Sequence, residues 1–177
     1  GSVPHGNSVM GILAGGSIIF TLGLIDDLYN ISPYIKLLGQ FLAAIVAFYM
    51  GVQINVLDLP GSKVLVLNAF SFPVTIIWLV AIANAMNFID GVDGLAGGVT
   101  LLSAVTLAVV AVFTNQPVAA LLAALLAGAS LGFLAYNFYP AKIFMGDVGS
   151  LAIGSALGLI AVIVKQEIIF FVISLLF

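Results

Sequence analysis

The chain has 177 residues, of which 63% are hydrophobic and 6% are charged, and its formal net charge is −3. A soluble globular domain usually carries about 25% charged residues, so this composition, with a mean hydropathy of +1.33, excludes an ordinary soluble fold and indicates a polytopic membrane protein. The four basic residues are all lysines and there is no cysteine, which excludes disulfides and thiolate metal sites and argues against a nucleic-acid partner.

Apolar segments follow one another along the whole chain. The sequence predicts them at about residues 9–25, 36–51, 71–88, 95–113, 117–136, 149–164 and 167–177. A membrane-spanning helix needs roughly 20 apolar residues, so the last segment is too short to cross. We therefore expect an all-α polytopic membrane protein with six to seven transmembrane helices, forming a single domain over residues 1–177.

The longest polar connection lies between the second and third segments. The sequence "VQINVLDL", then Pro60-Gly61, then "SKVLVLN" alternates at period two around a turn dipeptide. This pattern predicts a β-hairpin outside the hydrocarbon layer.

Five of the seven acidic residues are predicted to share one face of the membrane. They form three groups along the chain: Asp26 with Asp27, Asp90 with Asp93, and Asp147 alone. The chain is predicted to cross the membrane twice between each group and the next, so all three return to the same face. Asp58 and Glu167 fall on the opposite face by the same parity. The lysines divide two against two, with Lys36 and Lys142 on the acid-rich face and Lys63 and Lys165 on the other. The positive-inside rule therefore leaves the orientation open.

Acids gathered at one depth repel one another, and partial desolvation raises their pKa values. Each could be a solvated loop charge, and Asp26 and Asp90 could be capping groups, but neither interpretation explains the shared face. Mg²⁺, which prefers a few carboxylates with phosphate oxygens and water, would relieve the repulsion. Glycines surround the acids, in "DGVDGLAGG" and "MGDVGS". Their exposed N–H groups are suited to phosphate, so the pattern indicates phosphoryl transfer.

The stretch "NAMNFIDGVDGLAGG" has informative spacing. Asn84 and Asn87 are three residues apart and share a helix face. We expect the helix to open near Gly91, so that Asn87, Asp90 and Asp93 surround a ligand while Asn84 caps or braces the turn.

Three stretches carry a family resemblance. In order, "GLIDDLYNISPYIKLLGQ", "NAMNFIDGVDGLAGG" and "NFYPAKIFMGDVGSLAIG" resemble signature segments of the polyprenyl-phosphate N-acetylhexosamine-1-phosphate transferases. The resemblance implies that a polyprenyl phosphate, such as undecaprenyl phosphate, attacks the β-phosphorus of a UDP-sugar and releases UMP. It also implies Mg²⁺ (or Mn²⁺), a cytoplasmic active face in the plasma membrane with the hairpin outside the cytoplasm, and commonly a homodimer.

The resemblance also implies roles for residues of this chain. It makes Asp26, Asp27 and Asp147 catalytic, with one of the Asp pair deprotonating or positioning the lipid phosphate, and Asn87 and Asp147 metal ligands. It makes Lys36, Asp90, Asp93, Asn137 and Phe144 substrate-binding, with Phe144 stacking on the base. Phe144 taken alone could instead be an interfacial aromatic, and Lys142 could anchor at the headgroups or reach a phosphate.

The expected sugar is GlcNAc-1-phosphate, because Ile89 stands where the phospho-muramoyl-pentapeptide branch tends to have threonine. That branch is one alternative. The family's N-terminal helices and its late histidine loop have no counterpart here, and the single histidine, His5, is expected on the opposite face. An inactive membrane fragment is therefore a second alternative, and a cation transporter is a third. A CDP-alcohol phosphotransferase needs an arginine that this chain lacks.

Overall fold

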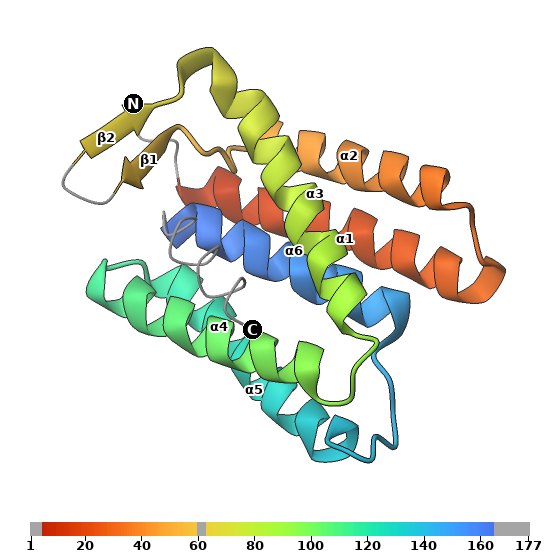
Figure 1. Ribbon diagram of the computed structural model, residues 1–177. Helices are drawn as coiled ribbons and strands as arrows, with labels where there is room; N and C mark the ends of the chain where they lie inside the picture. Colours follow the sequence, from red (N-terminus) through yellow and green to blue (C-terminus); the bar gives the residue numbers. More distant parts are fainter. Residues whose placement is uncertain (1–4, 60–62, 165–177) are drawn as a thin grey trace.

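The computed structural model describes residues 5–59 and 63–164, which form helices and one small hairpin joined by short loops (Figure 1). The helices are α1 (His5–Tyr29), α2 (Pro33–Tyr49), α3 (Ser71–Ile89), α4 (Leu95–Phe113), α5 (Pro117–Asn137) and α6 (Gly146–Val164); the strands are β1 (Val56–Leu59) and β2 (Lys63–Val66), followed by a 3-10 turn, η1 (Asn68–Phe70). Five of the described helices are long and apolar enough to cross a membrane, and α2 is shorter, with 17 residues. The protein is an all-α, multi-pass membrane protein, as the sequence predicts; the predicted segment 167–177 lies outside the described residues.

Two helix ends differ from the prediction in a way that matters for the acids. Helix α1 continues to Tyr29, so Asp26 and Asp27 belong to its last turn rather than following it. The helix ends because Asn30 adopts a positive φ of 49°, with its N–H donating to the Asp26 carbonyl at 2.7 Å. Helix α6 begins three residues earlier than predicted, so Asp147 lies in its first turn and not in a loop.

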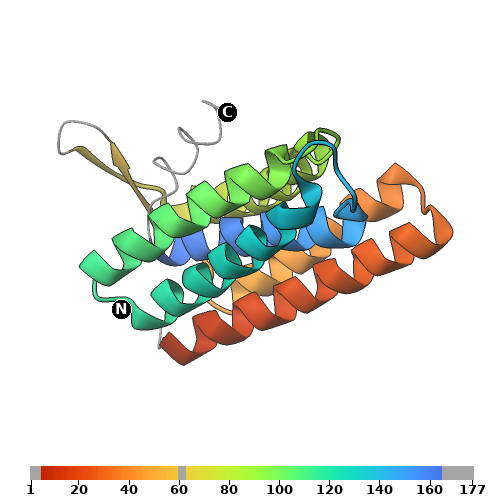
Figure 2. The same ribbon diagram turned by 90° about the horizontal axis from the view of Figure 1, so that it is seen from below.

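Helix α6 lies at the centre of the molecule and contacts α1, α3, α4 and α5, an arrangement visible in Figure 2. Leu151, Leu157 and Ala161 on α6 are fully buried. The indole nitrogen of Trp78 on α3 donates to the Gly158 carbonyl of α6 at 3.3 Å, in the middle of both helices. Because α6 packs against most of the bundle, its first turn is held by several elements at once.

The hairpin and the acid-rich end lie at opposite ends of the bundle (Figure 1). Strands β1 and β2 pair antiparallel, with Val56 opposite Val66. The segment before the hairpin is attached to α3, because the Thr75 hydroxyl accepts from the Ile54 N–H at 2.9 Å. Asp58 lies in β1 at this end, whereas all five acids of the predicted cluster lie where α1 and α3 end and α6 begins. The parity argument is therefore confirmed for these residues; Glu167 lies outside the described part of the chain.

Candidate active site

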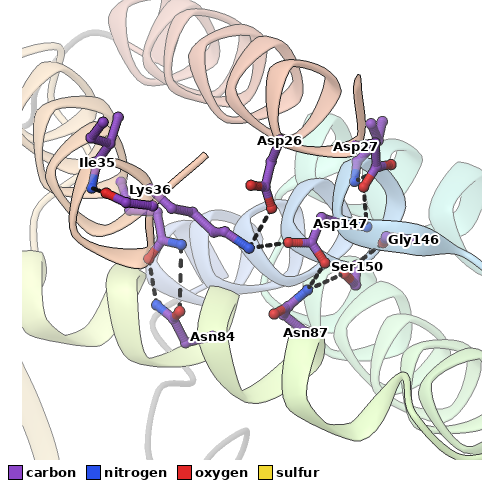
Figure 3. A network of polar contacts seen from close by, with 12 residues as sticks. Asp26, Asp27, Ile35, Lys36, Asn84, Asn87, Gly146, Asp147 and Ser150 are labelled. Carbon is purple, nitrogen blue, oxygen red and sulfur yellow. Dashed lines mark hydrogen bonds and ion pairs between the residues drawn. The ribbon is translucent and has the colours of Figure 1, made fainter. Parts of the chain in front are cut away.

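The first turn of α6 is fixed by a carboxylate from another helix. Gly146 has a φ of +68°, a conformation that favours glycine, and it turns the chain into the helix. The Asp27 carboxylate on α1 accepts from the N–H groups of Asp147 at 3.0 Å and Val148 at 3.2 Å (Figure 3). Asp27 therefore caps α6 in the way an N-cap side chain does, but from a different element. This contact sets the position of Asp147.

A close approach of α1 to α6 makes that cap possible. A Cβ atom on Gly23 would lie 2.7 Å from Val148 Cα and 2.9 Å from the Asp147 carbonyl oxygen. Gly23 lies one turn before Asp27 on α1, so glycine at this position allows the two backbones to meet.

Lys36 joins two acids that come from different helices. Its ammonium forms ion pairs with the Asp26 carboxylate of α1 and with the Asp147 carboxylate of α6 (Figure 3). Asp26 is 7% exposed, and the Lys36 side chain is 19% exposed. Three helices thus place two carboxylates around one cation at the end of the bundle.

Asn87 extends this group onto α3. Its amide nitrogen donates to the Asp147 carboxylate at 2.8 Å and to the Ser150 hydroxyl at 2.9 Å. The Ser150 hydroxyl in turn donates to the Gly146 carbonyl at 2.7 Å. Ser150 was not predicted from the sequence, although its spacing of three from Asp147 on a helix would have placed both on one face.

Asn84 has a structural role, but it joins α3 to α2 instead of capping or bracing the turn near Gly91 as predicted. Its amide nitrogen donates to the Gln40 side-chain carbonyl and to the Val80 carbonyl, the latter at 2.7 Å. Its own oxygen accepts from the Gln40 amide nitrogen at 3.4 Å. Gln40, which is 1% exposed, was missed by the sequence analysis because a single glutamine inside an apolar helix gives no chemical signal.

Asp90 lies directly after α3, beyond the membrane-spanning segment. Burial raises the pKa of Asp90 to about 6 from the usual 3.8, and the Asp147 carboxylate adds to the rise, whereas the N–H of Gly146 opposes it. The expectation that acids gathered here acquire raised pKa values is confirmed for this residue.

A second group of predicted residues frames the loop between α5 and α6. The Asp93 carboxylate accepts from the Ala141 N–H at 2.9 Å. The buried Asn137 amide accepts from the Gly94 N–H at 3.0 Å and donates to the Ile143 carbonyl at 2.9 Å. Asn137 and Asp93 therefore hold the loop, and Asp93 makes different contacts from Asn87 rather than joining it in one ring.

The same loop carries the exposed aromatic residue of the prediction. Phe144 is 67% exposed, so its ring is available to a ligand and is not part of the core. The side chain of Lys142, two residues earlier, is exposed as well. The predicted site residues thus form one directly bonded group on α1, α2, α3 and α6, and a second group around residues 138–145.

The bonded group suits a cation that takes further ligands from a substrate. The carboxylates of Asp26 and Asp147 converge on a single positive charge, which here is the Lys36 ammonium. Among residues 5–59 and 63–164, no three His, Cys, Asp or Glu side chains form a metal-holding cluster by themselves. The carboxylate of Asp147 and the neighbouring amide of Asn87 fit Mg²⁺, which is usually bound by one or two carboxylates together with phosphate oxygens and water.

Comparison with known proteins identifies the family. The family model described as Glycosyl transferase family 4 matches residues 9–165. The chain is 38% identical, over 86% of its length, to a probable undecaprenyl-phosphate N-acetylglucosaminyl 1-phosphate transferase of Bacillus subtilis, covering 43% of that protein. It is 42% identical, over 83% of its length, to a decaprenyl-phosphate N-acetylglucosaminephosphotransferase of Mycolicibacterium smegmatis, covering 39% of it.

A third relative is a phospho-N-acetylmuramoyl-pentapeptide-transferase of Streptococcus uberis, at 35% identity over 98% of this chain and 56% of the relative. The chain thus spans between about two fifths and just over half of the length of these curated relatives. The matched region includes every residue of the bonded group described above. This chain belongs to glycosyl transferase family 4.

Proposed function

We propose that this chain carries the phosphoryl-transfer site of a polyprenyl-phosphate N-acetylhexosamine-1-phosphate transferase, with GlcNAc-1-phosphate as the sugar transferred from a UDP-sugar. The observation that carries the proposal is the Lys36 ammonium held between Asp26 and Asp147, next to Asn87, at one end of the bundle. Two of the relatives above are named for GlcNAc-1-phosphate transfer to a polyprenyl phosphate.

The proposed reaction needs charge control more than a strong base. An oxygen of the lipid phosphate forms a bond to the β-phosphorus of the UDP-sugar, and the bond from that phosphorus to the oxygen shared with the α-phosphorus breaks. UMP leaves with the shared oxygen, and a polyprenyl-diphosphate sugar remains. A phosphate monoester has its second pKa near about 6, so the nucleophile is largely ionised at neutral pH.

The side chains of the bonded group can hold two anionic substrates together. Lys36 would bind phosphate oxygens, and Asp26 keeps its ammonium at the site. Asp147 and the amide oxygen of Asn87 would hold Mg²⁺, which supplies neutralisation of the diphosphate when it is bound. Positioning of this kind accounts for much of the rate in phosphoryl transfer. The exposed ring of Phe144 would stack on the uracil, beside the loop held by Asp93 and Asn137.

Muramoyl-pentapeptide phosphate is the second candidate substrate. It is supported by the relative from Streptococcus uberis, whose match extends over 98% of this chain. Relatives of similar identity are named for both substrates, and the GlcNAc proposal keeps first place because Ile89 stands where the phospho-muramoyl-pentapeptide branch tends to have threonine. A cytoplasmic active face in the plasma membrane and a homodimer are further parts of the proposal, and they rest on the family resemblance.

Asp147→Ala tests the assignment most directly. Radiolabel transfer from UDP-GlcNAc to undecaprenyl phosphate is measured with the purified protein, in Mg²⁺ and in EDTA. We expect Mg²⁺-dependent product from the wild type and a loss of at least about 100-fold in Asp147→Ala, because the variant removes a proposed ligand of the Mg²⁺ that neutralises the diphosphate. Asp58→Ala, which removes a carboxylate from the hairpin at the opposite end of the bundle, is the matched control and should retain most activity.

The possible outcomes separate the hypotheses. Full activity in Asp147→Ala contradicts the metal assignment. Product only from UDP-muramoyl-pentapeptide selects the second candidate. No product from either donor, in a wild-type protein that is folded, contradicts the proposed activity for this chain and supports the inactive fragment.

A further inference from the structure

A pair of side-chain amides joins α2 to α3 close to the candidate site. The amide nitrogen of Asn84 donates to the Gln40 carbonyl, and the Gln40 amide nitrogen donates back to Asn84 at 3.4 Å. The second N–H of Asn84 is used by the Val80 carbonyl, at 2.7 Å. Gln40 is almost completely buried, so the loss of its partner would leave a desolvated amide unpaired.

Each member of the pair lies one helical turn from a residue of the candidate site. Gln40 follows Lys36 by four positions on α2, and Asn84 precedes Asn87 by three on α3, so each couple shares a helix face. Lys36 and Asn87 both contact the carboxylate of Asp147, on α6 (Figure 3). The relative position of α2 and α3 at this depth therefore decides whether both side chains reach the same acid.

Apolar packing around the pair is incomplete. A cavity of about 20 Å³ lies beside Gln40, and much of its lining consists of small side chains: Gly15, Ala43, Ala44, Ala47 and Ala83. Small side chains let two membrane helices approach closely, but apolar contacts have no preferred direction. Hydrogen bonds between two amides, in contrast, require a defined distance and direction.

We propose that Gln40 and Asn84 are positioning residues, which set the register of α2 against α3 so that Lys36 and Asn87 converge on Asp147. Neither touches a substrate in this proposal, and their effect on catalysis rests on the function proposed above. A displacement of about 1 Å at a reacting centre can cost about 100-fold in rate, so the loss of one amide has a large effect at a distance.

The test compares three variants that share one background. Gln40→Leu and Asn84→Leu each break the pair, and Gln40→Asn combined with Asn84→Gln exchanges the two amides while keeping the summed side-chain length. Gln53→Leu removes a glutamine amide at the hairpin end of the molecule and is the matched control, because its described bonds, to the Phe48 carbonyl and from the Asn55 amide nitrogen, do not join α2 to α3.

Two readouts are measured, and neither requires turnover. The chain has no cysteine, so spin labels at Leu38→Cys on α2 and Phe88→Cys on α3, both exposed, report the distance between these helices. Titration with Mn²⁺, followed by the electron paramagnetic resonance signal of the free ion, reports the metal affinity of the folded protein. We expect the two Leu variants to shift or broaden the distance distribution and to weaken Mn²⁺ binding about tenfold, and the exchanged pair to restore both.

Each result supports or overturns one part of the proposal: the register of α2 against α3, or its effect on the metal site. Unchanged distances in both Leu variants overturn the register role, whatever the metal does. Altered distances with unchanged Mn²⁺ affinity overturn the positioning role. If the Leu variants alter the distances and the exchanged pair restores them, the register role is supported. If the wild-type protein also binds no Mn²⁺, the metal part of the proposed function is overturned.

Discussion

Asp90 is the residue at which the local environment most clearly alters acid–base behaviour outside the membrane-spanning segments. Its pKa is raised to about 6 by burial and by the neighbouring Asp147. Because the folded-state value lies above the ordinary value of 3.8, this group favours folding below a pH of about 4. That contribution is lost as the pH rises through about 6.

Asp90→Asn isolates this effect. The melting temperature of wild type minus that of the variant should fall between pH 4 and pH 7.5, because only the wild type acquires a partly buried charge in that interval. Thermal unfolding in detergent with EDTA, at several pH values, gives the difference directly. A difference that is constant across the interval would show that Asp90 is ionised throughout.

Asp27 acts on a whole element, because its carboxylate caps the first turn of α6 from α1. Asp27→Ala should cost about 1 kcal/mol, the usual value for a lost N-cap, and the loss should be concentrated at the start of α6. Asp27→Asn keeps one acceptor oxygen, so its stability should lie between that of the wild type and that of Asp27→Ala. Amide hydrogen exchange at Asp147 and Val148 measures the effect, and equal protection in all three proteins would exclude a capping role.

Helix α1 offers a matched pair of glycines for the packing against α6. Gly23→Ala places a Cβ 2.7 Å from the Val148 Cα, so the helices must separate, at a cost of about 1–3 kcal/mol. Gly16→Ala adds the same methyl group where no atom lies within 4 Å. The first variant should lower the unfolding temperature and the second should leave it nearly unchanged. Equal effects would mean that the approach of α1 to α6 is not tight at Gly23.

At the scale of the whole molecule, the hairpin and the acid-rich end must face opposite sides of the membrane. Single cysteines at Asp58 and at Tyr139, which is 82% exposed, test the proposed orientation. In intact cells, an impermeant maleimide should label Asp58→Cys, and it should label Tyr139→Cys only after permeabilisation. The reverse pattern would place the acid-rich end outside the cytoplasm.

Hydropathy and parity were sufficient to predict the helices, the hairpin and the shared face of the five acids. The number of membrane crossings does not depend on where a helix ends. The five acids were therefore placed on one face correctly, although the predicted end of α1 at residue 25 and the predicted start of α6 at residue 149 were wrong. The error at residue 149 arose because the cap on α6 comes from Asp27, 120 positions earlier in the chain. The error at residue 25 arose because α1 continues through Asp26 and Asp27 and ends only at the positive φ of Asn30. The Gln40–Asn84 pair was beyond prediction for a related reason, since it depends on which faces of α2 and α3 meet.

The shortness of α2 has a consequence for the bilayer. Its 17 residues extend about 26 Å, less than a hydrocarbon layer of about 30 Å, so the membrane must thin beside it or the ends of the helix must be drawn inward. Lys36 lies within one turn of the end of this helix. Both adjustments bring lipid headgroups to the level of its ammonium. The membrane around α2 would then form a shallow depression, into which the lipid phosphate of the proposed reaction could diffuse laterally without being lifted out of its leaflet.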